Sequence, residues 1–226
     1  MAQSTPKISA NKLGEYMTAT PARRRAIISD AKHPKTYKLI TYTEARRAIT
    51  TYLGSGLTAH GAYDTAINLI ESNQALTDFD TQQKTLNLEA LNNFKKTIKG
   101  LHFDGLTTKF AGQSQLKLKI AGVDVSVSPL VRLFSTLRNG DPVIGAVLVH
   151  FSKTTPLSKE AGIYVSTLMH WHLEVHYSGN EAPDPALCWA IDVPTQKIFT
   201  STRRYSRRRS NLEAACEEIT ARWPLI

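Results

Sequence analysis

Residues 143–151 read VIGAVLVHF, a run in which every residue except His150 is apolar, at odd and even positions alike. A strand with one exposed face alternates apolar and polar residues, so this run predicts a central strand that is covered on each face. A second buried strand, LCWAIDV, is expected at residues 187–193. Between the two strands we expect a helix from about Lys159 to Tyr177, with Ser158 as its N-cap.

Outward from this strand the period of the pattern changes. Upstream, QLKLKI at residues 115–120 and VDVSVS at residues 123–128 alternate strictly around Ala121-Gly122, which predicts a hairpin with one buried face. The first hundred residues instead carry apolar residues at helical spacing, and a closing helix is expected over Asn211–Trp223.

This order of elements predicts a mixed α/β fold with one central sheet flanked by helices. We expect a helical region over residues 1–76 and an α/β domain over residues 77–226. No stretch rich in Gly, Ser or Pro separates the two regions, so the first helices are expected to pack on the sheet.

The composition is that of a globular protein with a large positive surplus. The chain has 226 residues, of which 42% are hydrophobic, and a formal net charge of +9. A surplus of this size repels itself in the folded state, and nucleic-acid phosphate is the commonest partner that offsets it. A basic protein that is merely soluble is the alternative.

Cysteine usage and hydropathy predict where the protein works. Cys188 and Cys216 are the only cysteines, too few for a disulfide framework, so a reducing compartment is expected. The first residues lack the apolar run of a signal peptide, and no charge-free apolar stretch reaches the roughly 20 residues that span a bilayer. We expect a soluble cytoplasmic protein without a membrane partner.

The segment TRRYSRRRS at residues 202–210 concentrates positive charge. Guanidinium groups bind phosphate as planar forks and a tyrosine ring can stack on a base, so this mixture predicts a nucleic-acid surface. A solvated basic loop without a partner is the alternative. The expected contact residues are Arg203, Arg204, Tyr205, Arg207, Arg208 and Arg209.

A second basic cluster opens the helix that Thr20-Pro21 begins. Arg23, Arg24 and Arg25 fill its first turn, where each cation at the positive helix end costs about 0.3 kcal/mol or more. A bound phosphate would offset this cost, and we include the three arginines among the expected nucleic-acid contacts. The alternative is that they extend into solvent.

The stretch HWHLEVH at residues 170–176 is rich in histidine. His172 and His176 are four residues apart and therefore share a helical face, as two zinc ligands would. Glu174 points to a different face, and no third ligand is assigned. Histidines that pack the helix against its neighbours are the favoured interpretation.

The order of elements after residue 80 resembles the core of the PD-(D/E)XK, or restriction-endonuclease-like, nucleases. The specific similarities are Gly122–Pro129 (GVDVSVSP) on the second strand and Ile144–Val149 (IGAVLV) on the third. The resemblance covers roughly residues 80–226 and implies a central mixed sheet flanked by helices. In that family, carboxylates on these strands hold a divalent metal, and a lysine helps to activate the attacking water.

The chain departs from that family where its chemistry resides. Pro129 is followed by Leu130 in place of an acid, and the third strand presents Ala146 and Leu148 where an acid and a lysine are required. Aliphatic side chains neither hold a metal nor transfer a proton. The resemblance therefore implies a degenerate catalytic motif.

Relocated residues offer a substitute for the missing motif. Asp124, Glu89 and Lys153 form the candidate catalytic set, with Asp124 as the metal ligand and Mg²⁺ as the cofactor if the protein is an enzyme. The alternative is that Asp124 is a solvated strand residue and Lys153 a surface lysine. Otherwise no cofactor is expected.

Three functions remain open from the sequence. The first is a non-cutting nucleic-acid-binding protein, with duplex DNA as the expected partner, that serves as an accessory or subunit of a DNA-processing or phage-defence system. The second is an active Mg²⁺-dependent endonuclease that uses the relocated residues. The third is a basic subunit that binds other proteins, with tyrosines of the helical region as anchors: Tyr16, Tyr37, Tyr42 and Tyr52.

Overall fold

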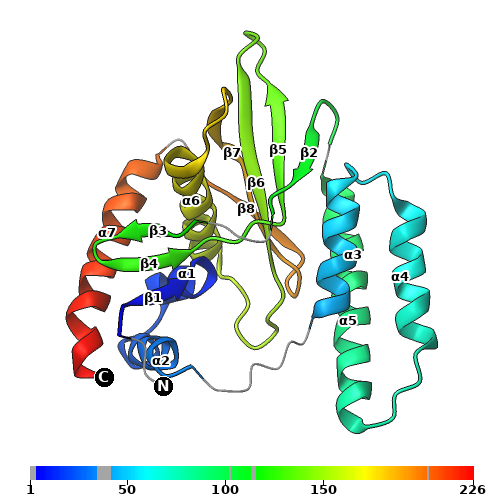
Figure 1. Ribbon diagram of the computed structural model, residues 1–226, viewed down its shortest axis with the longest axis horizontal. Coiled ribbons are helices and arrows are strands. Elements are labelled where there is room, and N and C mark those ends of the chain that lie inside the picture. The colour runs from blue at the N-terminus through cyan, green and yellow to red at the C-terminus, as the bar shows by residue number, and fades with distance from the viewer. Residues whose placement is uncertain (1–3, 35–41, 102, 113–115, 203) are drawn as a thin grey trace.

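The computed structural model describes residues 4–34, 42–101, 103–112, 116–202 and 204–226. Its largest sheet has the strand order β2-β5-β6-β7-β8 (Figure 1). Strands β6 and β7 are parallel, and the other neighbours are antiparallel. The bounds are β2 Thr107–Phe110, β5 Val131–Thr136, β6 Pro142–His150, β7 Ala182–Asp192 and β8 Lys197–Thr200.

Helix α6 (Lys159–His176) connects the two parallel strands. Ser158 accepts a hydrogen bond from the amide of Ala161 at 3.2 Å, which confirms the expected N-cap. Almost every residue from Ala161 to Leu173 is buried, because the helix lies between the sheet and a second layer of elements.

The hairpin expected around Ala121-Gly122 forms, but in a separate sheet. Strands β3 (Leu118–Ile120) and β4 (Val123–Ser126) meet at a two-residue turn with φ of 43° and 82°, as a type I′ turn requires. Strand β1 (Lys7–Ser9) pairs with β4 in parallel and completes a sheet of order β1-β4-β3. The expectation of one central sheet is therefore corrected to two sheets.

The two faces of the large sheet support two cores, so the mixed α/β fold is confirmed. Along β6, Ala146 and Leu148 face one core and Val147 and Val149 the other. The first core is covered by the small sheet and by helices α1 (Ala10–Thr18), α2 (Pro21–Lys32), α6 and α7 (Tyr205–Arg222). The second is covered by α3 (Thr43–Gly54), α4 (His60–Ser72) and α5 (Asp78–Thr97).

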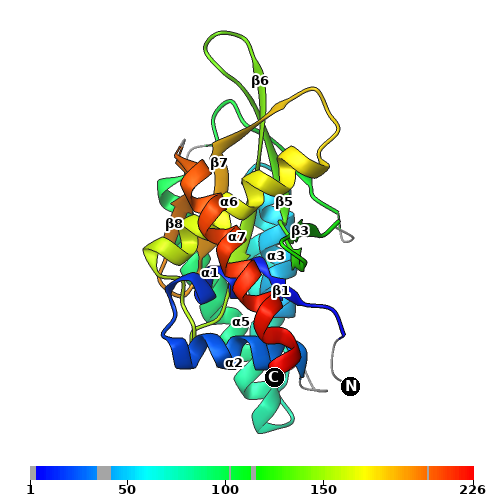
Figure 2. The same cartoon turned by 90° about the vertical axis from the view of Figure 1, so that its left-hand side faces the viewer.

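The first helices pack on the α/β elements, as expected. Helix α1 packs against α6, and the C-terminal end of α7 lies beside α2, where the Lys32 amine donates to the carbonyl of Trp223 at 2.7 Å (Figure 2). Short 3₁₀ turns follow α5 (Ile98–Gly100) and α7 (Trp223–Leu225). The expected division at residues 76 and 77 falls between α4 and α5, which contact each other.

Two element bounds differ from the expectation. Helix α7 begins at Tyr205 instead of Asn211, because Tyr205 and Arg209 pack against α6. Strand β7 begins at Ala182 instead of Leu187 and includes Pro183. Strand β8 pairs with β7 only from Trp189 onward, so Pro183 lies where β7 has one neighbour and its missing amide is tolerated.

Within the described residues, no helix is both long enough and apolar enough to cross a bilayer.

Gly145 lies on β6 at a point where this strand closely approaches β7. A Cβ atom there would lie 2.2 Å from the carbonyl oxygen of Leu187. We expect Gly145→Ala to lower the free energy of unfolding by about 1–3 kcal/mol, measured by urea denaturation. Gly61→Ala is the control, since nothing lies within 4 Å of a Cβ atom at this helical position. Equal stability of the two variants would contradict the close approach.

Candidate nucleic-acid interface

The first turn of α7 carries most of the basic segment 202–210. Arg204 is the N-cap residue and provides no side-chain hydrogen bond to the helix, and no acidic residue lies in the first turn. The backbone amides at the start of α7 therefore add to the positive field of the arginines. Arg203 lies outside the described residues.

Arg209 is held inside the protein and does not point to solvent. Its guanidinium forms an ion pair with Glu174, donates to Nδ1 of His170 at 3.0 Å, and lies 5.1 Å from the ring centre of Trp171 and 4.6 Å from that of Tyr205. Arg209 and Tyr205 therefore pack α7 on α6, and their expected contacts with nucleic acid stay a prediction.

Three other arginines stay available to a ligand. Arg204 and Arg207 are exposed and Arg208 is half-buried. Arg208 donates to the hydroxyl of Thr202 at 3.2 Å. Across the described part of the chain, none of the three has a carboxylate within 4.0 Å.

The arginines at the start of α2 are offset by the protein itself. Arg23 pairs with Glu15 at 2.7 Å, and Arg24 pairs with Glu218 at 3.5 Å and donates to the carbonyl of Tyr16 at 3.1 Å. Burial raises the pKa of Glu15, but hydrogen bonds from Lys12 and Arg23 outweigh it and lower this pKa below its ordinary value. The expected phosphate at this turn stays a prediction, for which Arg25 is the one exposed arginine of the three.

The histidines of α6 pack the helix against its neighbours, as the favoured interpretation had it. Nε2 of His172 lies 2.8 Å from the carbonyl oxygen of Leu116, and Nε2 of His176 lies 3.1 Å from that of Lys117. Buried His170 contacts the carbonyl of Pro183 at 3.2 Å. These bonds attach α6 to the segment that leads into β3 and to the start of β7.

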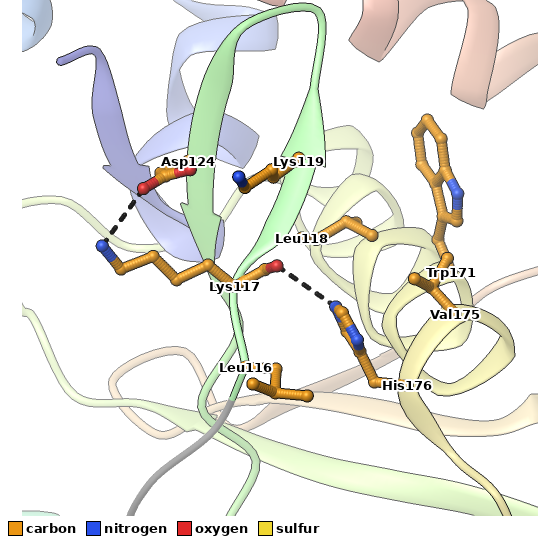
Figure 3. A pocket seen from close by; sticks show the side chains of 8 residues that line it. All are labelled: Leu116, Lys117, Leu118, Lys119, Asp124, Trp171, Val175 and His176. Carbon is orange, nitrogen blue, oxygen red and sulfur yellow. Dashed lines mark hydrogen bonds and ion pairs between the residues drawn. The ribbon is translucent and has the colours of Figure 1, made fainter.

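A groove of about 500 Å³ lies between α6 and the β3–β4 hairpin. Figure 3 shows the side chains of α6 on one side of the groove and those of the hairpin on the other. The apolar walls include Leu116, which is 67% exposed, and Val175, which is 55% exposed. The complete lining is Leu116, Lys117, Leu118, Lys119, Asp124, Trp171, Val175 and His176.

Asp124 lies among lysines. Its carboxylate is 3.2 Å from the amine of Lys117, and its neighbours in register are Lys7 on β1 and Lys119 on β3. The Lys117 ammonium already compensates the charge of this carboxylate and opposes the approach of a divalent cation. The position therefore does not favour Mg²⁺.

The structure brings together two of the three expected catalytic residues and leaves Asp124 apart. Glu89 on α5 forms an ion pair with Lys153, beyond β6, at 2.7 Å. Helix α5 packs on one face of the large sheet, whereas β4 packs on the other, so the sheet separates Glu89 from Asp124 (Figure 1). In the described residues, no group of three or more His, Cys, Asp or Glu side chains is placed to hold a metal.

Both cysteines are buried free thiols. Burial raises the pKa of Cys216 to about 12 and the pKa of Cys188 further above its ordinary value. Neither thiol is suited to act as a nucleophile near neutral pH.

Lys117, Lys119 and Trp171, which line the groove, were not among the site residues predicted from the sequence. Lys117 and Lys119 form the polar face of QLKLKI, and that alternation was a signal of an exposed basic strand face. Trp171 stands between two histidines, and only the folded chain shows that it borders the same groove as these lysines.

His172 makes the stability of the protein depend on pH. Burial, with neighbouring His176 and Arg132, lowers the pKa of His172 below 6.5, against the hydrogen bond to Leu116, which raises it. Below pH 6.5 the unfolded chain binds the proton more readily, so the stability that the neutral ring contributes is lost as the pH falls toward the folded pKa.

We expect His172→Gln to lose less stability than the wild type between pH 7.5 and 5.5, measured by urea denaturation. The difference in slope cannot exceed about 1.4 kcal/mol per pH unit for one group. Between pH 7.5 and 8.5 the two curves should run parallel. Equal losses on acidification would contradict the role assigned to His172.

Comparisons with known proteins assign the chain to no family: no protein-family model matches it, and no curated protein matches it. The resemblance to the PD-(D/E)XK nucleases stays a hypothesis that rests on the order of elements and on the two strand motifs.

Proposed function

We propose that this protein binds nucleic acid without cutting it. The binding surface is the basic face, which we define by six residues: Lys7 and Lys119 on the small sheet, Lys117 just before β3, and Arg204, Arg207 and Arg208 at the start of α7. Trp171 joins the two parts, because it lines the groove beside the lysines and contacts Arg209 of α7.

One observation carries the proposal. Arg204, Arg207 and Arg208 lie at a helix end without a side-chain cap and without a carboxylate partner in the described structure. A phosphate there gains from the guanidinium groups and from the backbone amides at the same time. At the start of α2, by contrast, Glu15 and Glu218 already provide the compensation.

The absence of cutting rests on the position of the carboxylates. Asp124 is flanked by lysines, and Glu89 pairs with Lys153 on the opposite side of the sheet. A two-carboxylate metal site is therefore not supported by this arrangement. The Mg²⁺-dependent endonuclease is the less favoured function.

The protein-binding alternative loses most of its anchors. Tyr16 and Tyr52 are buried, and Tyr42 stacks on Phe151. Tyr37 lies outside the described residues. The side chains of Tyr16, Tyr42 and Tyr52 belong to the packing of the protein more than to an exposed docking face.

The cellular setting follows by analogy alone. Buried free cysteines support a cytoplasmic location. The nuclease resemblance supports an accessory role in a DNA-processing or phage-defence system, with duplex DNA as the partner expected from the sequence.

The salt dependence of binding tests the basic face. We expect the affinity for an oligonucleotide, measured by fluorescence anisotropy, to fall steeply between about 50 and 200 mM salt. The triple variant Arg204→Gln/Arg207→Gln/Arg208→Gln should flatten the log–log slope by about one for each phosphate that the variant no longer neutralises.

The triple variant Arg47→Gln/Lys96→Gln/Lys99→Gln is the matched control. It removes the same charge from the exposed sides of α3, α5 and the turn after α5, beyond the opposite face of the sheet. Equal flattening in both triple variants would show a general charge effect, and an unchanged slope in the first would remove the α7 arginines from the site.

Incubation with supercoiled plasmid and Mg²⁺ or Mn²⁺ tests the absence of cutting. We expect the plasmid to stay supercoiled, because no pair of carboxylates among the described candidates is placed to share a metal. Asp78→Ala, at the exposed start of α5, controls for contaminating nuclease. Cutting that survives in Asp78→Ala and disappears in Asp124→Ala would reverse the proposal.

A further inference from the structure

The groove beside α6 combines apolar walls with positive charge. Leu116 and Val175 are large apolar side chains that stay more than half exposed, and they border the groove together with Trp171. Lys117 and Lys119 line the same groove. Its volume of about 500 Å³ falls within the range of about 300–1,000 Å³ that is typical of sites for small organic groups.

Trp171 is held in place from the side of α7. The guanidinium of Arg209 lies 5.1 Å from its ring centre, and Arg209 is itself fixed by Glu174 and His170. Because one side of the indole is covered, a group that enters the groove meets the remaining surface of a ring that is already ordered. Little side-chain freedom is then lost on binding.

The charges beside the groove fit a phosphate chain. Lys119 has no carboxylate within 4.0 Å among the described residues, and Lys117 contacts Asp124, the one acidic side chain of the lining. Figure 3 shows Lys117, Lys119 and Asp124 on the hairpin side of the groove, with the side chain of Lys117 directed away from α6 and toward Asp124. A ligand with one planar apolar group and flanking negative charges complements this arrangement.

We propose that the groove takes one unpaired base of the bound nucleic acid, stacked on Trp171, while the adjacent backbone phosphates contact Lys117 and Lys119. This inference rests on the proposed function, and it favours single-stranded or locally unpaired nucleic acid over the duplex DNA that the sequence led us to expect. Bases inside a duplex are stacked on both faces and reach a protein ring only after they leave the helix. Single strands are therefore bound in preference to duplex.

The chain contains its own probe. Of its three tryptophans, Trp189 and Trp223 are 8% and 4% exposed, and only Trp171 is half-buried. Quenching of tryptophan fluorescence by an oligonucleotide therefore reports on the groove. We expect a single-stranded DNA of mixed sequence to quench the emission and to bind about tenfold more tightly than the same sequence as a blunt duplex. A single-stranded RNA of the same sequence, measured in parallel, shows whether the groove prefers DNA or RNA.

Two variants separate stacking from folding. Trp171→Leu should weaken single-strand binding about tenfold and weaken duplex binding less, because a paired base does not reach the ring. Trp171→Phe should lose the fluorescence change but keep most of the affinity, because an aromatic ring remains on Arg209. Affinity is measured by anisotropy of a labelled oligonucleotide, so that it does not depend on the indole, and circular dichroism confirms the fold of each variant.

The outcomes are distinct. Equal affinity for single strand and duplex, or full affinity in Trp171→Leu, would overturn the inference while nucleic-acid binding stands. Wild-type protein that binds neither form at about 50 mM salt would overturn the proposed function itself. Quenching of Trp171 fluorescence by a single strand, together with weaker binding of that strand to the Trp171→Leu variant, supports both the inference and the proposed function.

Discussion

Strand β6 is covered on both faces, and this burial organises the molecule. Because side chains alternate along a strand, each face of β6 needs its own apolar layer. Ala146 and Leu148 pack toward the small sheet, α6 and α7, whereas Val147 and Val149 pack toward α3, α4 and α5. The large sheet thus separates two layers of the molecule, and polar groups lie in separate places on either side of it. This separation keeps Asp124 apart from Glu89 and leaves the basic face on the layer that α7 closes.

Within that layer, two helices begin with arginines but meet different surroundings. Arg23 and Arg24 at the start of α2 have carboxylates from α1 and α7. At the start of α7 only Arg209, among the described arginines, has such a partner, and it holds the helix to α6. The unfavourable interaction of cations with the positive helix end is relieved by carboxylates at α2, whereas Arg204, Arg207 and Arg208 at α7 have no such partner in the described structure. The same sequence pattern therefore meets two different electrostatic surroundings.

The features that were predictable from the sequence are those with a local signal. The apolar run of β6, the alternation around Ala121-Gly122 and the cap at Ser158 all appear where the pattern placed them. The partner of β4 is a different matter, since β1 has three residues and lies more than a hundred positions away, too short to show a period. The candidate site could be predicted only in part for the same reason. The charges of Arg204 and Lys119 are evident from the sequence itself. The pairing of Arg23 with Glu15 and the position of Trp171 beside the hairpin depend on the folded chain.

The parallel pairing of β1 with β4 has a consequence for synthesis. Residues 7–32 are made before β4, α6 and α7, on which they pack, and the paired residues Lys7 and Asp124 lie more than a hundred positions apart. Helices α3, α4 and α5 contact one another over short sequence distances and can associate while the chain is still growing. The first segment instead has to wait in an open state, and until it arrives one edge of β4 is bare. Closure of the first core can therefore take place only after the chain has been made as far as α7.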